Sequence, residues 1–227
     1  MNLHRLVLTG LLCTLFAPAA CSPAEEESAD EATSDRNPLL FARTIQRSGP
    51  APDRFRVRFE TTAGEFVVEA HREWSPLGVD RFHQLVRAGF YDDTRFYRVV
   101  DGFMAQFGLN GDWQVNYVWK DENLQDEPVV GSNTRGRLAF AKGGPHTRTT
   151  ELYVNFADNS RLDVLGFSPF AEVVEGMEAV DRIYSGYGEG PPAGDGPYAA
   201  MIHARGNAYL DEEFPELTRI IRATVIE

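Results

Sequence analysis

Residues 96–108 constrain the fold of this chain more than any other stretch. Their sequence is FYRVVDGFMAQFG, and its first five residues have the pattern of a β-strand, with Phe96, Arg98 and Val100 on one face. Both faces of this strand are apolar, which predicts cover on both sides. An arginine, which cannot lose its charge, nevertheless lies at its centre. The guanidinium therefore needs either polar partners or a route to solvent.

The residues that follow add chemistry to this strand. Asp101-Gly102 predicts a turn, after which Phe103, Met104 and Gln106 come back beside the arginine. A cation, two large apolar side chains and an amide are thus brought together. Two interpretations stay open from this stretch alone. The arginine reaches solvent at the rim above a core Phe–Met pair, or the group is a functional site.

The chain begins with the features of an export signal. A basic start at residues 1–5 precedes an apolar run at residues 6–16, and small residues follow up to Ala20. This layout is typical of a secretory signal and is too short for a membrane span. We therefore expect residues 1–20 to be a signal peptide and the rest of the chain to be exported to the periplasm or cell envelope.

Cys21 is a candidate lipidation site. Pro18-Ala19-Ala20 resembles the end of a bacterial lipobox, although Pro18 stands where leucine is usual. The alternative is ordinary cleavage after Ala19 or Ala20, which would leave a free thiol. Because Cys13 would leave with the signal, no partner for a disulfide remains. Acylation of Cys21 would anchor the protein to a membrane.

The chain after the signal is acidic. Loss of residues 1–20 removes one arginine and no carboxylate, so the net charge of −12 becomes −13. We therefore expect no nucleic-acid partner and no anionic lipid surface, because both attract basic patches. Residues 21–53 combine the cysteine with polar, acidic and proline-containing sequence, which predicts a flexible linker. The apolar residues 39–41 interrupt it, and whether they dock on the domain stays open.

Residues 54–227 have the pattern of one mainly β domain with a single core. Phe55, Val57 and Phe59 alternate with polar residues, and a turn at residues 62–64 leads into a second strand. Ser75-Pro76 predicts the start of a helix that ends near residue 89. A second helix is predicted at residues 177–183. Further short strands are predicted at residues 96–100, 138–141, 152–156, 170–174 and 221–226. Residues 207–220 are predicted to be irregular, and whether a short helix follows Glu212 stays open. This pattern favours an antiparallel barrel or sandwich with helical caps.

Three blocks of the chain resemble cyclophilins. Residues 96–106 fit the family signature F-x-R-x-x-x-G-F-M-x-Q. The second block has GRLAFA at 136–141, Gly-Pro at 144–145 and Leu-Tyr-Val at 152–154; the third has Leu-Asp at 162–163, Phe170 and Glu-Gly-Met at 175–177. Their order and spacing agree over about residues 54–190. The resemblance implies a closed eight-stranded antiparallel β-barrel with two capping α-helices and an active site on its outer face.

The resemblance also implies an activity, the cis–trans isomerisation of the peptide bond before proline, without metal or cofactor. Arg98 would donate a hydrogen bond to the prolyl nitrogen and weaken the amide conjugation, and Gln106 would bind the substrate backbone. The family assigns the proline pocket to Phe103, Met104, Tyr153 and Leu162, and the residues before proline to Ala141 and the backbone of Lys142. The implied partners are proline-containing polypeptides, and we expect a monomer.

The chain departs from the family pattern at several of these positions. Glu151 stands where glutamine is usual, and strand alternation places it on the face of Tyr153. There it would fix Arg98 by a bidentate pair or compete with the substrate for it. Arg161 replaces a common tryptophan, which predicts weak cyclosporin binding. Phe167 lies near the position of a common pocket histidine, after a one-residue insertion.

Two function classes remain after this comparison. One is an active prolyl isomerase that assists the folding of exported proteins. The other is a catalytically weak or inactive module that binds proline-containing segments or a partner protein. A metal site is not expected, because His71, His83 and His146 are scattered along the chain and no cluster of cysteines or carboxylates accompanies them. The glycine-rich residues 186–192 lack the Lys-Ser/Thr of a phosphate loop and predict only a loop.

Overall fold

The computed structural model describes residues 37–226 of the 227. The predicted signal peptide, residues 1–20, and the lipidation site, Cys21, lie outside this range. Among the helices within it, none is long and apolar enough to cross a bilayer.

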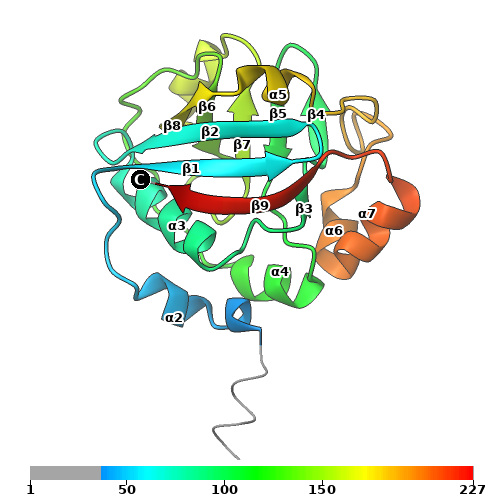
Figure 1. Ribbon diagram of the computed structural model, residues 1–227, viewed down its shortest axis with the longest axis horizontal. Helices are drawn as coiled ribbons and strands as arrows, with labels where there is room; N and C mark the ends of the chain where they lie inside the picture. Colours follow the sequence, from blue (N-terminus) through cyan, green and yellow to red (C-terminus); the bar gives the residue numbers. More distant parts are fainter. Residues whose placement is uncertain (1–36, 227) are drawn as a thin grey trace, which may run out of the picture. The chain divides into compact units, whose positions relative to one another are not determined.

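Nine strands of the described chain pair in one antiparallel sheet, in the order β3-β9-β1-β2-β8-β6-β7-β5-β4. The strands are β1 Arg54–Thr61, β2 Gly64–His71, β3 Thr94–Arg95, β4 Arg98–Val100, β5 Met104–Phe107, β6 Arg137–Phe140, β7 Leu152–Asn155, β8 Pro169–Glu175 and β9 Arg219–Ile226. Figure 1 shows β2, β1 and β9 side by side across one face of the molecule. The predicted hairpin at the start of the domain is confirmed as β1 and β2, which pair along their full length.

The prediction of a closed eight-stranded barrel was wrong. The two edges of the sheet are β3 and β4, which follow each other in the chain and are joined by Phe96 and Tyr97 rather than by a hydrogen-bonded ladder. These two residues leave the ladder because their rings enter separate clusters. Phe96 packs in the main core, 4.9 Å from Phe107 between ring centroids, and Tyr97 packs in a second cluster. The alternation of residues 96–100 predicts that Phe96 shares a face with Arg98. This prediction was wrong, because Phe96 points into the main core.

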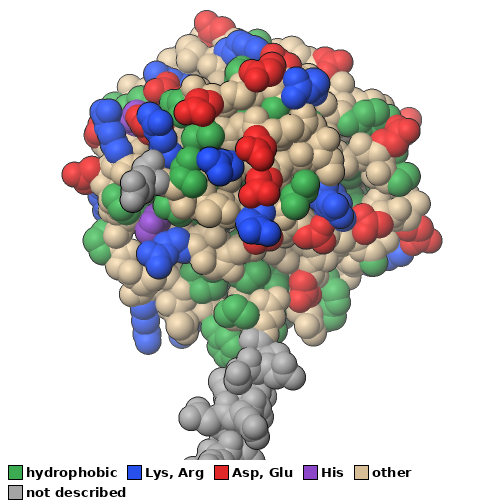
Figure 2. Space-filling model, in the orientation of Figure 1, with side chains coloured by type: hydrophobic (Ala, Val, Ile, Leu, Met, Phe, Trp, Pro, Cys, Tyr) green, Lys and Arg blue, Asp and Glu red, His purple; other side chains and the backbone are tan. Residues whose placement is uncertain are grey.

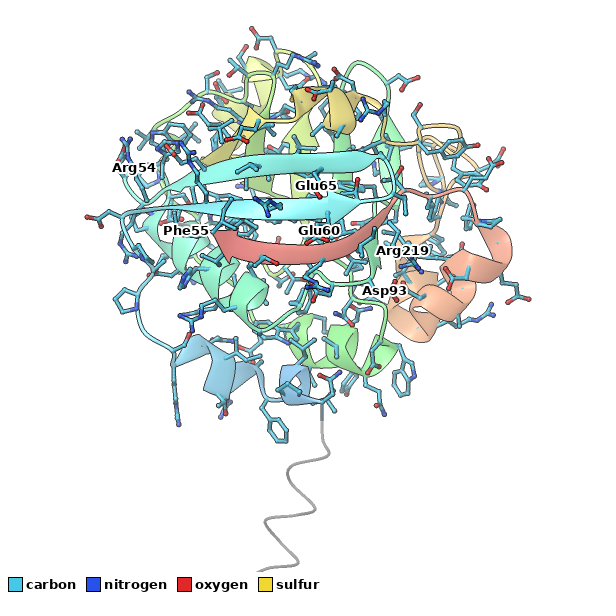
Figure 3. The ribbon with its side chains drawn as sticks, viewed as in Figure 1. Arg54, Phe55, Glu60, Glu65, Asp93 and Arg219 are labelled. Atoms are coloured by element: carbon cyan, nitrogen blue, oxygen red, sulfur yellow. The ribbon has the colours of Figure 1, made fainter. Side chains whose placement is uncertain are left out.

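The residues just before β3 contact β9, the last strand. Arg219 at the start of β9 lies beside Asp93, which precedes β3, with 3.6 Å between guanidinium and carboxylate (Figure 3). Asp93 has a φ of 56°, a left-handed conformation that aspartate tolerates because its short side chain bonds locally. Its backbone oxygen and carboxylate both accept bonds from Arg95. The chain is thus fixed a few residues before Arg98.

Residues 37–226 contain more helices than the two that the sequence predicts. The predicted helix after Ser75 is confirmed as α3, and the one near residue 177 is the short α5. The helices are α2 Ala42–Gln46, α3 Pro76–Arg87, α4 Trp113–Trp119, α5 Met177–Asp181, α6 Ala199–Arg205 and α7 Asn207–Glu213, with 3-10 turns η1 Pro38–Leu40 and η2 Ser160–Leu165. The additional helices have five to seven residues, too few for an apolar period to stand out. Two of them, α6 and α7, lie together beyond β3 (Figure 1), and α7 covers part of the segment predicted to be irregular.

The start of α3 is capped from a distance. The Ser75 side chain makes no cap bond to the helix; its hydroxyl donates instead to Glu127. The carboxylate of Glu127 accepts from the backbone N–H groups of Leu77 and Gly78, at 2.7 and 3.2 Å. Because the first N–H groups of a helix lack partners, this carboxylate satisfies two of them and complements the helix dipole.

The compact unit begins earlier than the boundary at residue 54 that the sequence predicts. It includes Asn37 and the residues after it. Leu39 is buried in the main core, and its carbonyl oxygen accepts a 2.9 Å bond from the indole N–H of Trp119. The apolar residues inside the predicted linker thus dock on the domain as η1 and α2.

The outer surface of β1 and β2 carries charges of both signs. Arg56 pairs with Glu69 at 2.9 Å, and Arg58 lies 3.9 Å from Glu65 on the neighbouring strand. Figure 2 shows basic and acidic side chains interspersed over this face. Such cross-strand pairs contribute little each, so the fold depends mainly on its aromatic core.

Candidate active site

One row of side chains crosses four neighbouring strands. Arg98 of β4 pairs with Gln106 of β5, which pairs with Tyr153 of β7, which pairs with Ala139 of β6. Because successive residues of a strand point to opposite faces, their chain neighbours identify the two faces. Those neighbours lie in the main core: Val99, Ala105, Val154 and Leu138. The row therefore lies on the outer face of the sheet.

A cavity of about 530 Å³ opens over this row. Its lining contains all ten side chains that the sequence predicts for the site: Arg98, Phe103, Met104, Gln106, Ala141, Lys142, Glu151, Tyr153, Leu162 and Phe167. Three further lining residues, Gly143, Thr147 and Leu165, were not predicted. The structure thus brings together residues from the strands β4, β5 and β7, from the segments that connect strands and from the 3-10 turn η2.

The floor of the cavity is apolar. Met104, Tyr153 and Leu162 are buried and pack in one cluster with Ala139, and Phe103 and Phe167 lie against it. The ring of Phe167 meets that of Tyr153 edge-on, with 6.0 Å between centroids. This arrangement offers a small apolar depression beside the cationic end of the row.

A buried polar network supports this floor. The hydroxyl of Tyr153 donates to Asn133 Oδ1 at 2.7 Å, and Asn133 Nδ2 donates to Asp163 Oδ1 at 2.7 Å. Asp163 also accepts from the Asn133 backbone at 2.9 Å. Burial raises the pKa of Tyr153, so its phenol stays protonated. Burial opposes ionisation of Asp163, but the bonds from Ser132 and Asn133 outweigh it and lower the pKa of this carboxyl.

The guanidinium of Arg98 is held on two sides. Nε and Nη2 donate to the two oxygens of Glu189 at 2.5 and 2.7 Å, and Nη1 donates to Gln106 Oε1 at 2.9 Å. Nη1 also lies 3.9 Å from the sulfur of Met104, at the edge of the apolar floor. The arginine therefore has polar partners and still borders the cavity, which answers the question raised by its place in an apolar strand.

Glu151 does not pair with Arg98, and the expected ion pair between them was wrong. Glu151 lies one residue before β7 begins, so strand alternation does not fix its direction. Its carboxylate accepts from the hydroxyl of Tyr97 and from Gln106 Nε2, the latter at 3.0 Å. Gln106 Nε2 also donates to the Tyr97 oxygen at 2.6 Å. Glu151 thus acts on Arg98 through the amide of Gln106.

These contacts set the charges at the site. The hydrogen bond from Arg98 lowers the pKa of Glu189, so this carboxyl is ionised at neutral pH. Burial and the nearby Glu151 carboxylate raise the pKa of Tyr97, which stays a hydrogen-bond donor. The site therefore contains a permanent cation, fixed donors and apolar walls.

The sequence of this site has clear relatives. Residues 56–200 match the family described as cyclophilin type peptidyl-prolyl cis-trans isomerase/CLD. The chain belongs to this family. Peptidyl-prolyl cis-trans isomerase B of Escherichia coli (strain K12) is 37% identical over 136 residues, which cover 56% of this chain and 82% of that one. The peptidyl-prolyl cis-trans isomerase of Acinetobacter baylyi is 32% identical over 135 residues, 56% of this chain and 70% of its own.

Solved structures show the same fold. A cyclophilin type peptidyl-prolyl cis-trans isomerase of Cryptosporidium parvum superposes on this cyclophilin with a TM-score of 0.57 and 17% identity, covering 77% of this chain and 98% of that one. A second crystal structure of the Cryptosporidium protein, in the presence of the dipeptide Ala-Pro, gives a TM-score of 0.56 at 18% identity, covering 76% of this chain and 99% of that one.

Two basic residues of this cyclophilin have roles that sequence reasoning left open. The amine of Lys142, predicted to contribute mainly its backbone, donates to Asp126 at 3.0 Å and lies 5.3 Å from the ring centroid of Phe167. Arg161, in place of the common tryptophan, stacks its guanidinium 4.7 Å from the ring centroid of Phe103. Both cations thus cover aromatic walls of the cavity.

The most consequential residue that the sequence did not predict is Glu189. It lies in the glycine-rich segment interpreted only as a loop, 91 residues after the arginine that it contacts. Its neighbours carry no periodic pattern that would place it in a sheet or helix. The one signal in the sequence is that Glu189 is the single charged residue among residues 186–192.

Proposed function

We propose that this cyclophilin catalyses cis–trans isomerisation of peptide bonds before proline in exported polypeptides. The observation that carries the proposal is the position of Arg98, a permanent cation at the border of an apolar depression. Glu189 and Gln106 together occupy three of its five N–H bonds, and Nη1 otherwise contacts only the weak acceptor Met104 Sδ at 3.9 Å, so one N–H on each Nη atom has no strong acceptor within the protein. The family supports the same activity.

The free N–H bonds suit the chemistry of the reaction. Rotation about a peptide bond has a barrier of about 18–20 kcal/mol because the nitrogen shares its lone pair with the carbonyl. A donor directed at the prolyl nitrogen stabilises the form in which that lone pair is no longer conjugated. This interaction is strongest at the twisted bond, so it lowers the barrier without favouring either ground state. Arg98 supplies it without any proton transfer.

The rest of the cavity positions the substrate. The apolar floor formed by Met104, Tyr153 and Leu162 would hold the proline ring beside Nη1 of Arg98. Gln106 has little capacity left for the substrate. Both of its amide hydrogens and one lone pair of its oxygen are used within the protein. We therefore assign Gln106 mainly to the orientation of Arg98.

The activity is tested with a short Ala-Pro peptide and with a refolding reaction limited by proline isomerisation. Wild type should accelerate both, and R98A should lose about a hundredfold or more of kcat/KM with unchanged circular dichroism. R135A, which removes a surface arginine outside the cavity, is the matched control. A wild-type protein that binds the peptide but leaves its rate at background would support the binding-module alternative instead.

The cellular setting is a separate part of the proposal. We propose that the protein is exported and acylated at Cys21, which would make it a lipoprotein of the cell envelope. The N-terminal sequence and Cys21 support this proposal. Wild type should incorporate a labelled fatty acid and fractionate with membranes, and C21S should do neither. A C21S protein that still fractionates with membranes would contradict the anchor.

A further inference from the structure

We propose that Glu189 is a positioning residue for catalysis, and that the glycine-rich segment at residues 185–196 is a scaffold that holds its carboxylate against Arg98. This inference rests on the proposed isomerase activity. It assigns a function to a segment whose sequence predicts only a loop.

The geometry of the ion pair fixes the plane of the guanidinium. Glu189 binds Nε and Nη2 side-on through both of its oxygens, and Gln106 binds Nη1 from β5. A two-point contact on one edge and a third contact on another leave the group no freedom to rotate. An arginine side chain otherwise has many rotamers, and fixing one of them before the substrate binds removes that entropic cost from the reaction.

Glu189 holds the arginine from outside the cavity. Arg98 is among the residues that line the cavity, and Glu189 is not. The carboxylate therefore binds the Nε and Nη2 edge of the guanidinium without lining the space available to a substrate. A carboxylate that blocked the substrate would have to line that space, so the arrangement favours orientation over inhibition.

The loop is packed closely around the backbone of Glu189. Its carbonyl oxygen accepts a 2.9 Å bond from Gly196 N–H. A Cβ atom on Gly194 would lie 2.3 Å from this oxygen, and one on Gly196 would lie 2.9 Å from it. The glycines are thus needed because the chain passes too close to Glu189 for a side chain. Gly190 N–H in turn donates to Glu189 Oε1 at 3.1 Å, which fixes the carboxylate itself.

Two opposing effects decide the sign of the expected result. The negative charge of Glu189 weakens the field of Arg98, whereas its geometry holds the remaining N–H bonds in place. Both side chains are about one-third exposed, at 31% and 33%, so solvent screens the charge effect. Orientation is not screened. Removal of the carboxylate should therefore lower the rate.

Kinetics of three variants test this directly. E189A should lower kcat and kcat/KM about tenfold with KM changed less than twofold, because the lost interaction matters at the twisted bond. E189Q keeps one acceptor and should lose only about threefold. D181A removes the partner of Arg135 in a surface ion pair that is more exposed, at 47% and 44%, and should leave kcat/KM unchanged. A rise in kcat/KM for E189A, or an equal loss in D181A, would overturn the proposal.

A double-mutant cycle shows whether Glu189 acts through Arg98. In an R98A background, the E189A substitution should cause no further loss of kcat/KM. Additive losses would mean that Glu189 contributes in another way, and the positioning role would fail.

An NMR measurement tests the contact between Glu189 and Arg98 independently of the proposed activity. In wild type the Nε–H resonance of Arg98, assigned by its absence in R98K, should be sharp and slow to exchange, and E189A should broaden it or make it exchange rapidly. Should wild type prove inactive, the proposed function fails while this measurement still decides whether the carboxylate fixes the arginine. An Nε–H signal unchanged in E189A would refute the contact on its own.

Discussion

The phenolic hydroxyl of Tyr97 donates a hydrogen bond to the carboxylate of Glu151. Both groups also accept from the amide nitrogen of Gln106, at 2.6 and 3.0 Å. Because a carboxylate is only an acceptor, Glu151 forces the NH2 end of Gln106 towards itself and turns the amide oxygen towards Arg98. Arg98, which only donates, and Glu151, which only accepts, thus fix the amide of Gln106 from its two ends.

E151Q should therefore lower kcat/KM, by about fivefold, the equivalent of about 1 kcal/mol for one weakened hydrogen bond. Glutamine at this position can donate as well as accept, so the amide of Gln106 would lose one of the two restraints on its orientation. Steady-state kinetics on an Ala-Pro peptide measure the effect. A higher rate in E151Q would mean that the carboxylate restrains Arg98 after all.

Y153F should destabilise the domain with little effect on the rate. It removes the 2.7 Å bond from the Tyr153 hydroxyl to Asn133 but keeps the ring in the cavity floor. The expected loss in the free energy of unfolding, measured by urea titration, is about 1 kcal/mol. Y117F, which alters a phenol that is 67% exposed, is the control and should leave the stability unchanged. A large fall in kcat/KM for Y153F would instead place this hydroxyl in the reaction.

L39A should lower the free energy of unfolding by about 2 kcal/mol, because Leu39 is only 8% exposed and packs in the main core. F41A, two residues later and 40% exposed, should change it by less than about 0.5 kcal/mol. Equal stability of L39A and wild type would contradict the docking of this segment.

The contribution of Glu189 to stability should depend on pH. The bond from Arg98 holds the pKa of its carboxyl below the usual value of 4.5 in the folded protein. Its contribution is therefore complete above the unfolded pKa and is lost as the pH falls through the folded pKa. Relative to E189Q, wild type should be more stable at pH 7 by less than about 1 kcal/mol. The difference should vanish under more acidic conditions, and a difference that grows as the pH falls would contradict the ion pair.

The sequence predicts the part of the site that is local in the chain. Arg98 and Gln106 lie on adjacent strands of one hairpin and Phe103 lies in its turn, so their proximity follows from the turn predicted at residues 101–102. Tyr153 and Leu162 were placed by their resemblance to family blocks, and the structure brings both to the same cavity. The predicted helix α3 followed from a regular apolar period and was likewise found.

The features that the sequence did not predict depend on tertiary packing. Glu189 reaches Arg98 only because a loop of close-packed glycines folds back against the arginine, and no local pattern encodes that path. Glu151 was assigned the wrong partner because alternation was extended one residue beyond the start of β7. The split between β3 and β4 arises from two rings that enter different clusters, a choice that depends on distant residues such as Phe107.

The row from Arg98 through Gln106 and Tyr153 to Ala139 has a consequence for how activity is acquired during folding. Its members come from four strands that meet only through the backbone ladder, and a shift of one residue in any pairing would send a member into the core. No isolated hairpin can contain the complete row. Isomerase activity should thus appear only when the sheet has assembled. A measurement of activity during refolding would therefore report whether the strands have paired in the correct register.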